Sequence, residues 1–146
     1  MKKMIRFVCM VLVLSLGLAF PAHAESNSEA RGSAFFAAYT AYLYKTSSTS
    51  FQIWFEVDSN AALMQEIGVS TIEVYRSSDQ SNWIKIKTYK KANYSQMTDA
   101  NTYSHAGYVT YDIASPGYYY TAYVTFYAKN SSGVGERDMY TAILRM

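Results

Sequence analysis

Few side chains in this 146-residue sequence have types and spacings that could support catalysis. Glu56 and Asp58 are two residues apart on a predicted strand, so both carboxylates should point to the same face. Such a pair could flank a glycosidic bond, but hydrolysis needs one raised pKa and a cleft between the carboxylates. A small β-sheet protein offers little cleft. We therefore interpret the pair as solvated surface charge and keep a small secreted hydrolase as an alternative.

Nucleophilic and metal chemistry have little support after residue 24. The chain's one cysteine, Cys9, precedes that point, and His105 is the one histidine beyond it. This composition excludes a cysteine nucleophile and a multi-histidine metal site there, and no Gly-x-Ser-x-Gly elbow is present. We interpret His105 as a solvated loop residue and Asp79 as a side chain that caps its own Ser-rich turn. The sequence therefore predicts no enzyme, no metal site and no cofactor.

The unusual feature of the chain is its tyrosines. All fifteen follow residue 24, and several fall on one long predicted strand at 118–128, between Ser115-Pro116-Gly117 and a turn at 130–133. Because side chains alternate along a strand and a sandwich buries one face of each sheet, one row should be in the core. The row expected in the core is Tyr118, Tyr120, Ala122, Val124, Phe126 and Ala128. The row expected outside is Tyr119, Thr121, Tyr123, Thr125 and Tyr127.

Turn signals divide the rest of the chain into short strands. Over 51–57, apolar residues alternate with Gln52, Trp54 and Glu56, which is typical of a strand with one buried face. Residues 58–60 are expected to cap a short helix at 61–67 that ends at Gly68. The polar segment 90–107 is interpreted as a mobile loop. Further strands are predicted in the second half of 34–45 and at 71–76, 83–89, 108–113 and 139–144.

These elements predict the fold class. About seven strands, one short inserted helix and no βαβ rhythm indicate an all-β protein, an antiparallel Greek-key β-sandwich. Residues 34–146 are expected to form one domain, preceded by a flexible segment at 25–33.

The first 24 residues have the pattern of a secretory signal peptide. A positive start is followed by an apolar run over 7–20, and cleavage is expected after Ala24. The run is short for a transmembrane helix and no second one follows, so we expect a secreted, extracellular protein without a stable membrane anchor. Ten Lys and Arg against eleven Asp and Glu follow residue 24, a balance that leaves no basic excess for nucleic acid.

The last third of the chain resembles a fibronectin type III-like module, an immunoglobulin-like β-sandwich. The matching residues are Pro116-Gly117, Tyr120, the alternating Ala122, Val124, Phe126 and Ala128, and then Asn130 and Gly133. The resemblance implies that the Pro-Gly turn enters the sixth strand and that Tyr120 makes a tyrosine corner. The chain is also similar to a group of small uncharacterised secreted sandwich proteins of Gram-positive bacteria, which implies a compartment and a shape but no activity.

The resemblance also implies which strands flank the tyrosine row. The strand at 71–76 would pair with it, and the strand at 83–89 would lie beyond, with Tyr89 pointing outward. The outer face would then combine aromatic and basic side chains, which suit sugar rings and anionic groups. The candidate ligand-binding residues are Tyr75, Trp83, Lys85, Lys87, Tyr119, Tyr123 and Tyr127.

Three functions remain open. The first is a non-catalytic binding or adhesion module that meets a cell-wall or host glycan, or a surface protein, through this aromatic face. The second is a structural protein that self-associates through the same face as a homo-oligomer. The third is the small hydrolase. Cross-strand tyrosine pairs also stabilise a sheet by about 0.2–1 kcal/mol each without binding anything.

Overall fold

The computed structural model describes residues 34–60 and 62–146. The expected signal peptide at 1–24, its cleavage after Ala24 and the segment 25–33 lie outside these residues. The described part of the chain contains nine strands and one 3-10 helix, η1. Their bounds are β1 Phe36–Lys45, β2 Phe51–Ser59, β3 Glu66–Ser77, β4 Ile84–Lys90, η1 Ser95–Met97, β5 Thr98–Asp99, β6 Ser104–Tyr111, β7 Tyr119–Asn130, β8 Gly133–Tyr140 and β9 Leu144–Arg145.

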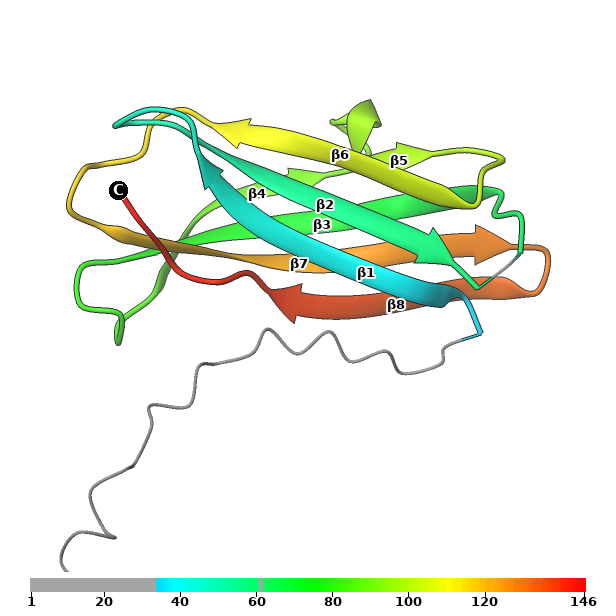
Figure 1. The fold of residues 1–146 in the computed structure, drawn as a ribbon. Coiled ribbons are helices and arrows are strands. Elements are labelled where there is room, and N and C mark those ends of the chain that lie inside the picture. The colour runs from blue at the N-terminus through cyan, green and yellow to red at the C-terminus, as the bar shows by residue number, and fades with distance from the viewer. Residues whose placement is uncertain (1–33, 61) are drawn as a thin grey trace, which may run out of the picture.

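The strands form two antiparallel sheets that face each other (Figure 1). The smaller sheet has the order β1-β2-β6. The larger has the order β4-β3-β7-β8, with β5 pairing with β3 and β9 with β7. The chain leaves the smaller sheet after β2, returns to it for β6 and leaves again for β7, which is a Greek-key path. The predicted all-β antiparallel sandwich is confirmed.

The core lies between the sheets and follows the alternation that the sequence predicts for two strands. On β2, Phe51, Ile53, Phe55 and Val57 are buried while Trp54 and Glu56 are not. On β7, Val124 and Phe126 are fully buried. Because each such side chain removes a large apolar area from water, these two rows supply much of the free energy that holds the sheets together.

The entry into β7 is fixed by a turn and a tyrosine. Gly117 has φ of 85°, a conformation that costs glycine little, and its amide donates to the carbonyl of Met146 over 2.7 Å. The amide of Ser115 donates to the hydroxyl of Tyr120 over 2.7 Å, and Tyr120 is fully buried. This is the geometry of a tyrosine corner, which the resemblance to a fibronectin type III-like module implies.

Replacing Tyr120 by Phe should destabilise the protein. The ring stays in the core, but the amide of Ser115 loses its acceptor, and we expect the free energy of unfolding to fall by about 1–2 kcal/mol. Urea denaturation followed by circular dichroism measures this change. Tyr118→Phe, which removes the same oxygen from the exposed neighbouring ring, is the matched control and should change little. Equal effects of the two substitutions would contradict a stabilising corner.

The expected helix at 61–67 is wrong. Met64 is bridged to Thr102, and from Glu66 onward the chain is already part of β3, which pairs with β7 and β5. Both Met64 and Ile67 are fully buried, so pairing with two strands outweighs the local preference of this segment for a helix. Gly68 lies within β3 instead of ending a helix. In the described residues no helix is long and apolar enough to cross a membrane.

The loop expected at 90–107 is also wrong in part. The segment contains η1, β5 and the first half of β6. Met97, the last residue of η1, is fully buried in the core. These elements are short, and most of their side chains are polar, so the sequence carries little periodicity there. One buried side chain and pairing with β2 and β3 are enough to order them.

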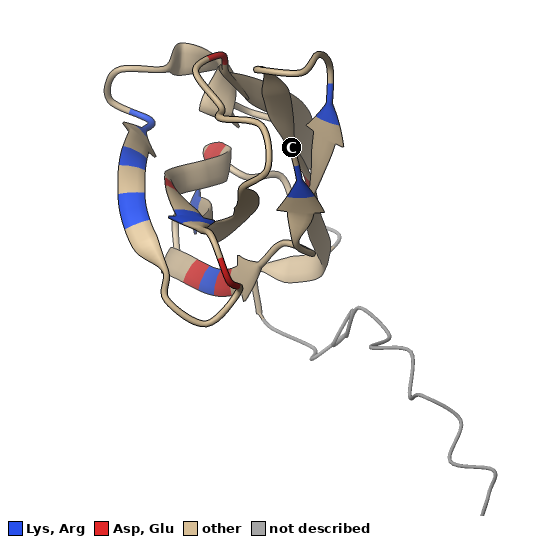
Figure 2. Ribbon diagram, turned by 90° about the vertical axis from the view of Figure 1, so that its left-hand side faces the viewer, with Lys and Arg blue, Asp and Glu red and all other residues tan. Residues whose placement is uncertain are grey.

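The strand predicted at 139–144 is displaced. β8 ends at Tyr140, and β9 begins only at Leu144, because the side chain of Thr141 interrupts the ladder by accepting a hydrogen bond from the amide of Ala122. Tyr118, expected in the core, is exposed because it precedes β7, and Ile113 is exposed because β6 ends at Tyr111, two residues before the predicted end of that strand. The edge strand β4 carries Lys85, Lys87 and Lys90, and blue bands follow one another along one strand in Figure 2. Lysines on an edge discourage pairing with a further strand.

Candidate functional site

The tyrosine row of β7 lies on the outer face of the larger sheet, as the alternation predicts. Tyr119, Tyr123 and Tyr127 are half-buried, and Tyr123 is paired with Tyr140 on β8 and with Glu73 on β3. Neighbouring side chains therefore cover the flanks of each ring. The row is present but less exposed than the sequence indicates.

The two ends of the row are covered by cations. Lys91 places its Nζ 3.4 Å from the ring centroid of Tyr127 and forms an ion pair with Glu66 over 2.9 Å. At the other end, the guanidinium carbon of Arg145 lies 5.6 Å from the ring centroid of Tyr119. Each contact occupies the ring face that a ligand would need. The open part of the surface is therefore the middle of the sheet.

Three tyrosines from three adjacent strands meet in that middle region. The ring centroids of Tyr123 and Tyr140 are 4.7 Å apart, and those of Tyr75 and Tyr140 are 6.3 Å apart. Tyr140 is 61% exposed, which makes it the most accessible of the three. Tyr140 is not among the residues predicted from sequence, because its place beside Tyr123 follows from the pairing of β8 with β7.

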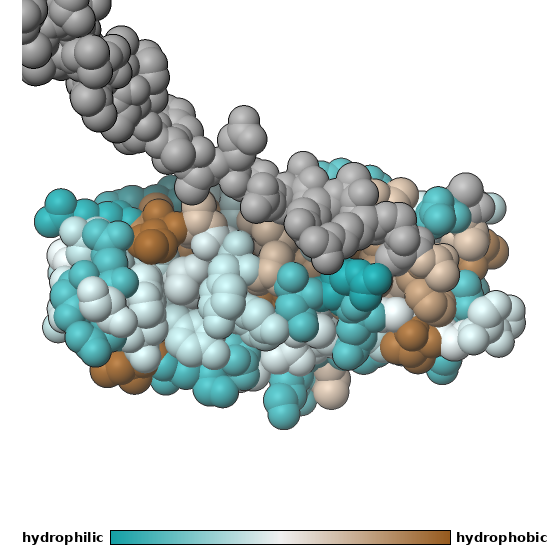
Figure 3. Space-filling view, turned by 90° about the horizontal axis from the view of Figure 1, so that it is seen from below, coloured by the Kyte–Doolittle hydropathy of each residue, from teal (hydrophilic) through white to brown (hydrophobic). Residues whose placement is uncertain are grey.

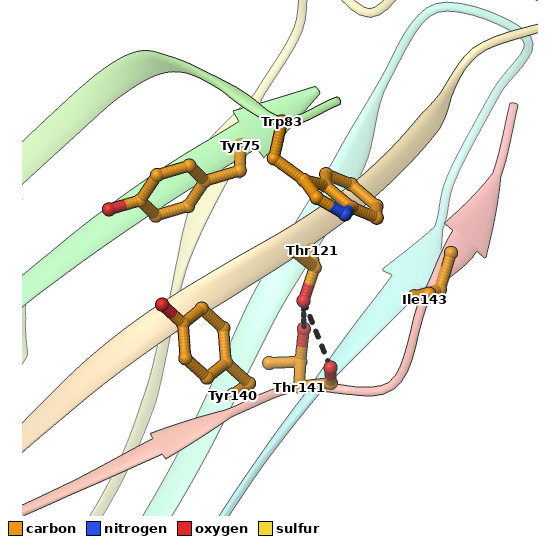
Figure 4. A pocket seen from close by; sticks show the side chains of 6 residues that line it. All are labelled: Tyr75, Trp83, Thr121, Tyr140, Thr141 and Ile143. Carbon is orange, nitrogen blue, oxygen red and sulfur yellow. Dashed lines mark hydrogen bonds between the residues drawn. The ribbon is translucent and has the colours of Figure 1, made fainter. Parts of the chain in front are cut away.

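A hollow of about 400 Å³ opens beside these rings, lined by Tyr75, Trp83, Thr121, Tyr140, Thr141 and Ile143. Figure 4 shows the two threonines lying between Tyr140, Trp83 and Ile143. The hydroxyl of Thr121 donates to the carbonyl of Thr141 over 3.0 Å, and both threonines are buried. The hollow thus has aromatic walls, a polar floor and no lining side chain that is ionised at neutral pH.

Trp83 is held by the hairpin loop that carries it. Its indole N–H donates to the carbonyl of Gln80 over 3.1 Å. One carboxylate, that of Asp79, accepts from the amides of Ser81 and Asn82, each over 2.9 Å. The pKa of Asp79 is held below its ordinary value, mainly by the hydrogen bond from the amide of Asn82 and next by that from the amide of Ser81. The predicted capping role of Asp79 is confirmed, and it gives Trp83 a defined position.

Tyr75 is held by a carboxylate in the same way. Its hydroxyl donates to Glu73 over 2.6 Å, and Lys85 contacts the other oxygen of Glu73 over 2.9 Å. The hydrogen bond to Glu73 is the main cause that raises the pKa of Tyr75 to about 12, and burial adds to it. Lys85 is therefore engaged in positioning one wall of the hollow instead of pointing freely to a ligand.

The titration of Tyr75 should show this contact. Because the folded-state pKa is raised, the hydrogen bond stabilises the protein below the ordinary phenol pKa, and this contribution is lost as the pH rises through about 12. In Glu73→Gln we expect the pKa of Tyr75 to return toward its ordinary value. Absorbance difference spectra near alkaline pH, with Tyr75→Phe to identify the signal, measure it. Identical tyrosine titrations of wild type and Glu73→Gln would contradict the contact.

The two predicted lysines on β4, Lys85 and Lys87, lie on opposite faces of the larger sheet. A register shift between Val74 and Tyr75 changes which face the residues of β4 share with β3. Lys85 is paired with outward Tyr75, but Lys87 is paired with buried Val74 and places its Nζ 5.4 Å from the ring centroid of Tyr89. Tyr89 is only 3% exposed, so its predicted outward orientation is wrong.

Glu56 and Asp58 lie on the outer face of β2 and line one hollow, whereas His105 is paired with buried Val57 and lies on the inner face. His105 is not a solvated loop residue: it lies on β6, contacts the carbonyl oxygen of Gln96 over 2.9 Å through Nε2 and packs on Phe55. Among residues 34–60 and 62–146, no group of three or more His, Cys, Asp or Glu side chains could hold a metal ion. The site that the geometry supports best is the aromatic hollow.

A scan of the sequence against protein-family models finds no match, and a search of curated proteins finds no significant one. The function of the protein is therefore inferred from the geometry of the site.

Proposed function

We propose that this protein is a secreted, non-catalytic binding module that holds a sugar ring of a cell-wall or host glycan in the aromatic hollow. The observation that carries the proposal is the hollow itself, where Tyr75, Trp83 and Tyr140 surround two threonines on the outer face of the larger sheet. Secretion is proposed from the N-terminal sequence, and a fibronectin type III-like family from Pro116-Gly117, the tyrosine corner and the strand order.

The chemistry of the walls and floor favours a neutral saccharide. The C–H face of a pyranose carries partial positive charge, and aromatic faces are negative, so the two attract each other while apolar area is buried. The hydroxyl of Thr121 already donates to the carbonyl of Thr141, but the oxygens of both threonines keep lone pairs that accept from sugar hydroxyls. An ionised ligand would find no opposite charge among the six lining residues.

The surface near β8 favours a polar ligand over a second copy of the chain. Seen from below, the part that grey atoms leave visible in Figure 3 is mostly pale and teal, with separate brown patches. Stable homodimer interfaces have more continuous apolar cores. Sedimentation velocity over a concentration series checks this, and a dimer that forms at micromolar concentration would favour the self-associating alternative.

A glycan screen tests the proposal. Labelled protein, beginning after residue 24, is applied to arrayed bacterial wall polysaccharides and host glycans, beside Trp83→Ala and Asp112→Asn. We expect retention on at least one neutral glycan, lost in Trp83→Ala and unchanged in Asp112→Asn. Retention that is the same for all three proteins would place binding elsewhere, and retention on protein ligands alone would reject a glycan.

A further inference from the structure

The outer face of the smaller sheet carries a second aromatic group on β1, β2 and β6 (Figure 1). Trp54 is paired with Tyr42 on one side and with Tyr108 on the other. Its ring lies 6.4 Å from that of Tyr42, with planes 4° apart, and 4.7 Å from that of Tyr108. Tyr42 is 49% and Tyr108 43% exposed. Three adjacent rings therefore form one accessible aromatic row across the whole sheet.

The aromatic row is fixed in place before any ligand arrives. The indole N–H of Trp54 donates to Oε1 of Gln52 over 2.9 Å, which holds the orientation of the ring. The side chains of Phe55 and Val57 on the opposite face of β2 are buried in the core. A rigid row loses little conformational entropy when it binds.

Carboxylates follow the aromatic row along β2. Trp54, Glu56 and Asp58 are alternate residues of β2, so all three point to the outer face. Alternate positions on a strand are about 7 Å apart. Their cross-strand neighbours Ala38, Thr40 and Ala106 are small, and a hollow of about 250 Å³ opens there, lined by Ala38, Tyr39, Thr40, Glu56 and Asp58. Within residues 34–60 and 62–146, neither carboxylate has an ion-pair partner.

We propose that this face is a second binding surface, for a polysaccharide whose sugars carry free, protonated amino groups. One sugar would stack on the aromatic row, and the next along the chain would place its ammonium group in the hollow between Glu56 and Asp58. The two attractions reinforce each other, because a cation is favoured both by carboxylates and by the faces of neighbouring aromatic rings. A neutral or anionic glycan would leave the carboxylates unpaired or repelled.

The same observations favour an amino sugar polymer over a basic peptide. An extended peptide gains its affinity by adding main-chain hydrogen bonds at a sheet edge, whereas the aromatic row and the carboxylates lie on the face of the sheet. The row is wide and offers ring faces to a flat partner. A pyranose presents such a flat C–H face with its ammonium in a fixed position, while a lysine side chain must first be ordered.

The chain's two tryptophans make this proposal independent of the first. Trp83 belongs to the hollow on the larger sheet, and Trp54 to the row on the smaller sheet. In Trp83→Phe, selectively excited tryptophan fluorescence therefore reports only on the smaller sheet. In Trp54→Phe it reports only on the hollow, so the failure of one proposal leaves the other standing.

The test is a titration of Trp83→Phe with glucosamine oligosaccharides of one length, beside their N-acetylated counterparts, at low salt and mildly acidic pH. We expect the glucosamine oligomer to change the emission of Trp54 and to bind about tenfold more tightly than the N-acetylated one. Glu56→Gln with Asp58→Asn should weaken it about tenfold, and so should Thr40→Lys, which leaves both carboxylates in place. Asp112→Asn with Glu136→Gln, which removes the same charge elsewhere, should leave the affinity unchanged within about twofold.

Three results would overturn the proposal. Equal affinity for the two oligosaccharides would remove the role of the amino group. An equal loss in the Asp112/Glu136 control would reduce the effect to net charge. Tighter binding of oligolysine than of a glucosamine oligomer of equal charge would assign the face to a basic peptide. Unchanged unfolding midpoints of the variants exclude a loss of fold as the cause.

Discussion

Replacing Gly68 by Ala should destabilise the protein by about 3 kcal/mol, one of the largest effects of any small substitution in this chain. Gly68 has φ of 149° and lies where β3 pairs with β5. An added Cβ would lie 2.7 Å from the Cα of Thr98 and even closer to the carbonyl oxygen of Met97. Both are backbone atoms of the η1–β5 segment, so the segment would have to shift as a whole. Urea denaturation measures the loss.

Gly117→Ala is the matched control for this effect. Gly117 also has positive φ, 85°, but an added Cβ would meet no atom within 4 Å. Its substitution should cost about 1–2 kcal/mol from backbone strain alone. If both substitutions cost the same, the chain around Gly68 is not packed against η1 and β5.

Removing two walls of the hollow should abolish useful affinity for its glycan. Trp83 and Tyr140 together contribute most of the exposed aromatic area there, and loss of both should cost about 3 kcal/mol of binding free energy, on the order of a hundredfold in Kd. The double variant Trp83→Ala with Tyr140→Ala is compared with wild type by isothermal titration calorimetry against the glycan retained in the screen.

A second double variant controls for the loss of large exposed side chains. Tyr103→Ala with Ile113→Ala removes two such groups, 56% and 73% exposed, that do not line the hollow. Its affinity should match wild type, and both double variants should keep the wild-type unfolding midpoint. A hundredfold loss in this control, or none in the Trp83/Tyr140 variant, would refute the proposed contact surface.

The parts of the fold that were predictable from sequence are those where side-chain alternation is strict. On β2, and on β7 from Ala122 to Ala128, buried residues alternate with more exposed ones, and the turn with Pro116 and Gly117 marks where β7 is entered. Trp54 was correctly assigned to the outer face for the same reason. Such strands have one face in the core, so their pattern records the tertiary structure.

The parts that were not predictable depend on pairing between distant segments. Residues 62–67 have no strong local pattern, and contacts with Thr102 and with β7 decide their conformation. The register shift beside Tyr75 reverses the orientation of Lys87 and Tyr89, and no residue type announces it. Tyr140 and Thr141 were missed because their role comes from the position of β8 against β7. Strand register of this kind is a property of the folded chain.

The most direct test of the aromatic hollow is an NMR titration of ¹⁵N-labelled protein with the neutral glycan retained in the screen. The chain has two indole N–H signals, one for Trp83 in the hollow and one for Trp54 on the opposite outer face. We predict that the Trp83 indole signal and the amides of Thr121 and Thr141 shift with increasing ligand while the Trp54 indole signal stays in place. Shifts confined to Trp54, or spread over residues far from the hollow, would contradict the proposed site.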